Sequence, residues 1–178
     1  LHGRTAVVLG TGDVGRCTAR LLSAFGVTVA GVNRGAAAVP GFDRVHPVGE
    51  LPKVLPEADL LIVAVPLTPA TRGLIGAGEL AALPPHALLV NVARGAVVVT
   101  EDLVAALESG RITAALDVVD PEPLPRDSPL WTAPGLLISP HVGGPSSAMW
   151  PRAYRLVRDQ LHRIARGEEP VNRTEDAS

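Results

Sequence analysis

The chain has 178 residues, of which 47% are hydrophobic and 19% charged, and its formal net charge is −2. A hydrophobic share of this size supports a folded core and excludes disorder over most of the length. The charge balance offers no basic surface for nucleic acid, and no apolar run reaches the roughly 18 residues of a membrane span. With one cysteine, Cys17, the chain lacks an intrachain disulfide and a cysteine-based metal site. We therefore expect a cytoplasmic protein with no metal, no nucleic-acid partner and no membrane partner.

Short apolar runs alternate with helical patterns along the chain. Strands are expected over residues 5–9, 27–32, 60–65, 88–92, 112–116 and 136–139. Helices are expected over 14–25, over 101–109 with Thr100 as the N-cap, and over 149–166. The apolar residues of the first helix are expected to face the core: Val14, Cys17, Leu21, Leu22 and Phe25. This alternation predicts an α/β fold with a Rossmann-type doubly wound parallel sheet and helices on both faces.

A glycine-rich turn joins the first expected strand to the first expected helix. Gly10, Gly12 and Gly15 form a G-x-G-x-x-G pattern, with Asp13 and Val14 before the last glycine. A preceding strand and a following helix are the context that marks a dinucleotide-binding turn. Gly10 permits the tight turn, Gly12 lets the backbone approach a pyrophosphate, and Gly15 lets the helix pack close to the strand. We expect all five residues to contact a cofactor at the helix N-terminus, the alternative being a plain tight turn.

The residues about 20 positions further on bear on the choice of cofactor. Dinucleotide sites usually carry an acidic residue there, which binds the adenosine ribose. Here Asn33 and Arg34 stand at the end of the second expected strand. Asn33 has no charge to repel a 2′-phosphate, and the guanidinium of Arg34 is well shaped to bind one. The pair favours NADP(H); the alternative is that Arg34 stacks on adenine or is solvated and NAD(H) is used.

Three polar segments follow the later expected strands, where open α/β sheets bind their ligands. Arg94 lies in residues 91–95, Glu122 in residues 117–124, and His141 in residues 139–144. Taken singly, each of these side chains has an ordinary explanation as a surface residue. Together, beyond successive strands of one dinucleotide-binding fold, they predict a catalytic site.

At these segments the sequence resembles the coenzyme-binding part of the D-isomer-specific 2-hydroxyacid dehydrogenases. Residues 1–5, 65–75 and 167–172 also resemble motifs of this family, so the likeness covers nearly the whole chain. The family includes glyoxylate/hydroxypyruvate reductases and phosphoglycerate dehydrogenases. The resemblance implies an oxidoreductase that interconverts a D-2-hydroxy acid and a 2-oxo acid by hydride transfer with NAD(P), and it implies a homodimer.

The resemblance also implies a role for each matching residue. His141 would be the general acid in reduction and the base in oxidation, and Glu122 would hold its imidazole and favour the protonated form. Arg94 would bind the substrate carboxylate and stabilise the developing oxyanion. On the adenosine side, the cofactor-binding residues would include Val65, Pro66 and Thr71. On the nicotinamide side, they would be Val92, Ala93, Arg94, Asp117, His141, Gly143 and Gly144.

Members of this family are longer than the chain, and most of their substrate domain precedes the first cofactor strand. We therefore expect residues 1–145 to form the NAD(P)-binding domain. Residues 146–178 would form a C-terminal helix and tail that returns to a substrate domain whose N-terminal part is absent. Leu1 then marks a truncated edge, and the chain alone would catalyse poorly.

Two other functions remain open from the sequence. One is a non-catalytic dinucleotide-binding protein, such as a corepressor, or an inactive fragment. The other is a related dehydrogenase that oxidises formate or phosphonate, although Glu122 disfavours a formate site, where the family pattern has glutamine. The particular 2-hydroxy acid does not follow from these residues.

Overall fold

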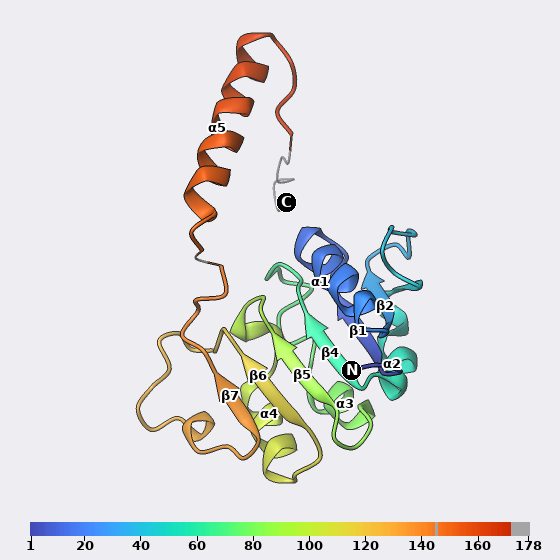
Figure 1. Cartoon of the computed structure of the whole chain (residues 1–178). Helices are drawn as coiled ribbons and strands as arrows, with labels where there is room; N and C mark the ends of the chain where they lie inside the picture. The colour runs from blue at the N-terminus through green and yellow to red at the C-terminus, as the bar shows by residue number, and fades with distance from the viewer. Residues whose placement is uncertain (145, 172–178) are drawn as a thin grey trace. The chain divides into compact units, whose positions relative to one another are not determined.

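The computed structural model describes residues 1–144 and 146–171, and it divides into two compact units, Leu1–His141 and a unit that begins at Val142. The first unit contains a seven-stranded parallel sheet in the order β3-β2-β1-β4-β5-β6-β7 (Figure 1). The strands are β1 (Thr5–Leu9), β2 (Thr28–Asn33), β3 (Arg44–Pro47), β4 (Leu60–Val63), β5 (Leu88–Asn91), β6 (Thr113–Leu116) and β7 (Leu136–Ile138). This order is that of a doubly wound sheet, which confirms the predicted fold class.

Five helices accompany the sheet in the described residues. They are α1 (Asp13–Ala24), α2 (Leu51–Val54), α3 (Ala77–Ala82), α4 (Thr100–Glu108) and α5 (Met149–Ala165). Four short 3₁₀ turns lie between elements: η1 (Val48–Glu50), η2 (Leu55–Glu57), η3 (Gly95–Val97) and η4 (Pro129–Trp131). The three predicted helices are confirmed, whereas β3, α2 and α3 were not predicted because they are short and lie among prolines and glycines.

The prediction that Thr100 caps α4 is wrong. The N-cap is Val99, which makes no side-chain capping bond. The Thr100 hydroxyl instead donates a hydrogen bond to the carbonyl oxygen of Asp120, at 3.1 Å. The residue therefore ties the start of α4 to the loop that follows β6.

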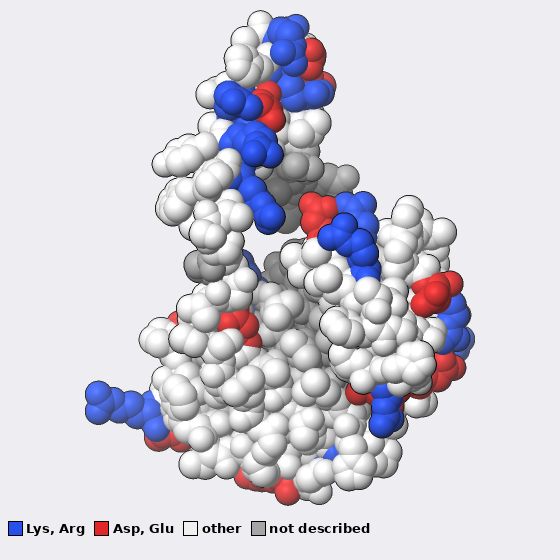
Figure 2. All heavy atoms as spheres, viewed as in Figure 1, with Lys and Arg blue, Asp and Glu red and all other residues white. Residues whose placement is uncertain are grey.

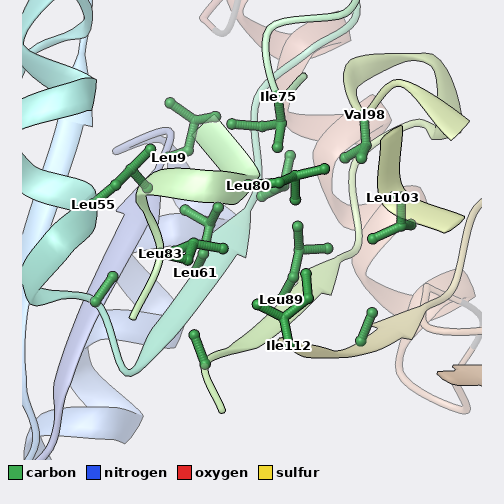
Figure 3. Close-up of a cluster of buried hydrophobic side chains, with 14 of the residues drawn as sticks. Leu9, Leu55, Leu61, Ile75, Leu80, Leu83, Leu89, Val98, Leu103 and Ile112 are labelled. Carbon is green, nitrogen blue, oxygen red and sulfur yellow. The ribbon is translucent and has the colours of Figure 1, made fainter. Parts of the chain in front are cut away.

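The core forms on both faces of the sheet because successive strand residues point to opposite sides. Val7 and Leu9 belong to the larger cluster, which α2, α3 and α4 cover, and Ala6 and Val8 belong to the smaller cluster under α1. Figure 3 shows ten labelled side chains of the larger cluster converging between the sheet and these helices. Burial of each large side chain there, such as Leu61, contributes about 1.5–3 kcal/mol.

The predicted core-facing side of α1 is mostly wrong. The buried residues of this helix are the small Gly15 and Ala19, and Leu22 is partly buried against the sheet. Because these small residues face the sheet, the helix lies close to β1. The other apolar residues that the sequence pattern predicted to be buried therefore point outward. These residues are exposed: Val14, Cys17, Leu21 and Phe25.

The second unit consists mainly of α5, which carries an exposed apolar stripe. Trp150, Tyr154, Val157, Leu161 and Ile164 follow one another at spacings of four and three residues, and all are more than half exposed. The rings of Trp150 and Tyr154 stack with their centroids 6.1 Å apart. Figure 2 shows the basic side chains that line other parts of this helix. The helix confirms the amphipathic pattern of the sequence.

The expected domain boundary and C-terminal tail can be compared with the described residues. The compact units divide at Val142, whereas the sequence places the functional boundary after residue 145, and that boundary stays a prediction. Position 145 and residues 172–178 of the expected polar tail lie outside the described residues. Within the described ranges, no helix has the length and apolar character needed to cross a membrane.

Candidate active site

The glycine-rich turn has the backbone geometry of a tight strand-to-helix connection. Gly10 has φ of +105°, and a Cβ built on it would lie 2.5 Å from the Ala64 carbonyl oxygen. A Cβ on Gly15 would overlap the carbonyl oxygen of Gly10. A Cβ on Gly12, in contrast, would meet no atom within 4 Å. Packing within the fold thus explains Gly10 and Gly15, and the open space at Gly12 fits the approach of a phosphate to the N-terminus of α1.

Asn33 joins the glycine-rich turn to the loop after β2. Its amide nitrogen donates to the Thr11 hydroxyl at 3.1 Å and to the Ala37 carbonyl at 3.2 Å, and its oxygen accepts from the Gly35 backbone N–H at 3.1 Å. The neighbouring Arg34 is exposed and has no carboxylate partner among the residues that the structure describes. Asn33 therefore shapes the loop, and the guanidinium of Arg34 remains available to an anion.

The ends of the parallel strands are aligned by one further hydrogen bond each. The backbone N–H of Ala64 donates to the Leu9 carbonyl, and the N–H of Val92 donates to the Val63 carbonyl. Likewise, the N–H of Asp117 donates to the Asn91 carbonyl, and the N–H of Ser139 donates to the Leu116 carbonyl. These bonds, 2.8–3.2 Å long, hold the residues after β4, β5, β6 and β7 in register. The polar segments singled out in the sequence therefore start side by side at one edge of the sheet.

A cavity of about 370 Å³ lies at this edge, between the N-terminus of α1 and the residues that follow β4 and β5. Six of the sequence-predicted residues line it: Val14, Val65, Pro66, Val92, Ala93 and Arg94. Ala64 and Leu67 line it as well. Sequence reasoning missed these two because a small and an apolar residue carry no chemical signal, although their place beside Val65 and Pro66 gave a positional one.

Thr71 holds the loop after β4 in a closed shape. Its hydroxyl donates to the Pro66 carbonyl oxygen at 2.7 Å and accepts from the Thr68 backbone N–H at 2.8 Å. The hydroxyl is thus used within the loop and shapes residues 65–71, and the predicted contact of Thr71 with a cofactor stays a prediction.

Arg94 is presented to solvent by a loop that Asn91 organises from inside the protein. Asn91 is only 1% exposed; its amide nitrogen donates to the Arg94 carbonyl and its oxygen accepts from the Ala93 N–H, both at 3.0 Å. A Cβ on Gly95 would overlap the backbone of Val119, so the loop after β6 lies directly against this one. Sequence reasoning quoted Asn91 but gave it no function, because its two hydrogen bonds exist only in the folded loop.

His141 and Glu122 form a hydrogen-bonded pair. The Nδ1 atom of His141 lies 2.8 Å from Oε1 of Glu122, and the two side chains are 44% and 41% exposed. Because a carboxylate can only accept, Nδ1–H is the donor, and Nε2 is left for proton exchange with a ligand. His141 has φ of +55°, a left-handed conformation that is uncommon for a residue with a side chain and is found at functional sites.

A second hollow in the first unit is less suited to catalysis. This hollow of about 510 Å³ is lined by Arg16, Cys17, Arg20 and Ser23 of α1 with Pro40 and Gly41, and its lining contains neither a histidine nor a carboxylate. Across residues 1–144 and 146–171, no group of three or more His, Cys, Asp or Glu side chains is placed to hold a metal ion. Gly143 and Gly144 lie in the second unit, and their predicted approach to the nicotinamide stays a prediction.

The sheet order, the glycine-rich turn and the histidine–carboxylate pair beyond the strand ends define a dinucleotide-binding domain of the dehydrogenase type. The sequence profile of the D-isomer specific 2-hydroxyacid dehydrogenase, NAD binding domain, matches residues 1–143. The chain belongs to this family, as its motifs indicated.

The proteins similar to this chain are longer than the chain. The chain is 36% identical to a glyoxylate/hydroxypyruvate reductase A of Klebsiella pneumoniae over 169 aligned residues. These residues make up 94% of the chain and 53% of that protein. A 2-hydroxyacid dehydrogenase of Xanthobacter autotrophicus solved with NADPH is 39% identical, with a TM-score of 0.89 over 97% of this chain and 71% of that one. A glyoxylate/hydroxypyruvate reductase of Sinorhizobium meliloti solved with NADP is 30% identical, with a TM-score of 0.88 over 97% and 55%. The chain spans about a third to a half of the length of the curated relatives it matches.

Proposed function

We propose that this protein interconverts D-2-hydroxy acids and 2-oxo acids by hydride transfer with NAD(P). The observation that carries the proposal is the His141–Glu122 hydrogen bond of 2.8 Å at the strand ends that also present Arg94. Similarity to reductases of glyoxylate and hydroxypyruvate supports 2-oxo acids as the substrate class.

Each side chain of the candidate site has a role in the reaction that follows from its chemistry. Bound NAD(P)H supplies the hydride. His141 donates a proton from Nε2 to the ketone oxygen in reduction and removes it in oxidation, while Glu122 fixes the ring through Nδ1. Arg94 binds the substrate carboxylate and stabilises the charge that develops on the ketone oxygen.

We propose NADP(H) as the favoured cofactor. Asn33 is neutral and already engaged in its loop, so no carboxylate at that position opposes a 2′-phosphate. The exposed Arg34 supplies the cation. Three of the similar solved structures contain NADPH or NADP, which is consistent with this preference.

The test is an absorbance assay of NADPH consumption by the protein expressed from its complete reading frame, with glyoxylate, hydroxypyruvate or pyruvate. We expect turnover with at least one of them, and a loss of about 10²–10⁴-fold in His141→Ala with NADPH binding retained. Unchanged turnover in that variant would refute the role of His141. NADPH binding without turnover on any 2-oxo acid would favour a non-catalytic binding protein instead.

We also propose that the protein is a homodimer, as the family resemblance implies, and that it is cytoplasmic, as its composition suggests. Leu21 on α1 and Phe25, the residue that caps its C-terminus, are 56% and 61% exposed and supply an apolar surface for a second copy. Analytical ultracentrifugation should give twice the chain mass for the unmodified protein and a smaller mass for Leu21→Glu. Cell fractionation tests the location.

A further inference from the structure

Ser139 connects three parts of the candidate site through one residue. It follows the last residue of β7 directly and is partly buried. Its backbone N–H donates to the Leu116 carbonyl at 2.8 Å, and its hydroxyl donates to Oδ1 of Asp117 at 2.5 Å. Its carbonyl oxygen accepts from the His141 backbone N–H at 3.0 Å.

The hydroxyl bond to Asp117 fixes a charged side chain at the end of β6. An O–H donor to a carboxylate at about 2.5–2.7 Å is among the stronger protein hydrogen bonds. Because the Asp117 backbone is itself held by the Asn91 carbonyl, the added side-chain bond restricts the rotamer of the carboxylate as well as its position. A carboxylate held in this way is ready to accept from an amide group of a ligand.

The carbonyl bond fixes the backbone of His141. The φ of +55° at this residue is an unfavourable conformation for a residue with a side chain, and it persists only where neighbouring groups enforce it. The turn from Ser139 over Pro140 to His141 provides that constraint. One residue therefore sets the relative positions of the Asp117 carboxylate and the His141 backbone.

We propose that Ser139 is a positioning residue for the nicotinamide half of the cofactor and for the acid–base histidine. The proposal rests on the proposed function and on the place of Asp117 on the nicotinamide side of the cofactor, which the family resemblance implies. Ser139 acts through Asp117 and His141. The adenosine half lies beyond other strand ends, at the glycine-rich turn and Asn33, which make none of these bonds. Loss of the hydroxyl should therefore weaken one half of the cofactor site and leave the other intact.

The experiment compares two ligands on the folded chain. NADPH contains the nicotinamide, whereas 2′-phospho-ADP-ribose has the same adenosine and pyrophosphate without it. In fluorescence and calorimetric titrations, Ser139→Ala should weaken NADPH about fivefold to tenfold and change 2′-phospho-ADP-ribose by less than about twofold. Ser139→Thr keeps the hydroxyl and should restore NADPH binding. Ser109→Ala removes an exposed hydroxyl at the far end of α4 and should change neither affinity.

The outcomes separate this inference from the proposed function. If Ser139→Ala weakens both ligands equally, or weakens neither, the positioning role is wrong while cofactor binding by the chain stands. Failure of Ser139→Thr to restore NADPH binding would also overturn the role of the hydroxyl. If the unmodified chain binds neither ligand, the proposed function fails, and the inference fails with it.

Discussion

Replacing Gly15 or Gly12 by alanine separates the folding role of the glycine-rich turn from its binding role. A Cβ on Gly15 would overlap the carbonyl oxygen of Gly10. That carbonyl has little room to move, because the Gly10 N–H is bonded to Val32 at 2.9 Å and its Cα faces Ala64. We therefore expect Gly15→Ala to reach the upper part of the overpacking range, about 3 kcal/mol, which lowers Tm by about 6–12 °C.

Gly12→Ala should have the opposite profile. Its Cβ meets no protein atom within 4 Å, and Gly12 is the N-cap of α1 with φ of −73°, which alanine adopts freely. The stability cost should be about 1 kcal/mol or less. The methyl group would, however, occupy the space proposed for the pyrophosphate, so NADPH affinity should fall at least about tenfold, or about 1.4 kcal/mol.

Thermal unfolding and NADPH titration of both variants test this reasoning. A Gly15→Ala protein that melts within about 2 °C of the unmodified chain would refute the packing argument. A Gly12→Ala protein that binds NADPH as tightly as the unmodified chain would show that no phosphate approaches this backbone.

Four further predictions concern stability, cofactor choice and thiol access. Leu61→Ala, at a side chain with no exposed surface, should lower the free energy of unfolding by about 2–5 kcal/mol in urea titrations. The Thr5 backbone N–H holds the pKa of the Asp59 carboxyl below its ordinary 3.8, so the stabilisation is present above that pH and is lost as the pH falls below it. Asp59→Asn should therefore cost about 1 kcal/mol near pH 7 and little near pH 2 in urea unfolding. Arg34→Ala should weaken NADPH at least about tenfold more than NADH in fluorescence titrations. Cys17 should react with a thiol reagent in the folded chain as fast as an exposed cysteine.

Each of these has a control and a contrary result. Leu137→Ala, at a side chain that is 68% exposed, should change stability by less than about 0.5 kcal/mol, and an equal loss in both leucine variants would refute the burial argument. A cost of Asp59→Asn that does not shrink in acid would mean that the carboxylate charge is not the stabilising feature. Equal loss of NADPH and NADH in Arg34→Ala would remove the argument for NADP(H). Slow labelling of Cys17 would contradict its exposure.

Much of the fold was predictable because its signals are local. The six predicted strands are apolar runs that end in glycine, proline or polar residues, and a buried parallel strand requires little more. β3, Arg44–Pro47, has only four residues, two of them polar or charged, and pairs with β2 alone, so no periodicity marks it. The Thr100 prediction was wrong because a hydroxyl before a helix can bond elsewhere, and only the folded chain brings the Asp120 carbonyl within its reach.

The sequence by itself determined the class of fold, the dinucleotide turn and the residue types of the site, because each depends on chemistry or spacing within one segment. Tertiary structure alone decided which face of α1 is buried, since that depends on how closely Gly15 and Ala19 let the helix approach the sheet. It also decided how the site is held together. The Asn91 side chain holds its own loop from inside the protein, where it is buried. The Ser139 hydroxyl joins the loop after β7 to the loop after β6, and such a bond forms only where parallel strands end at the same edge.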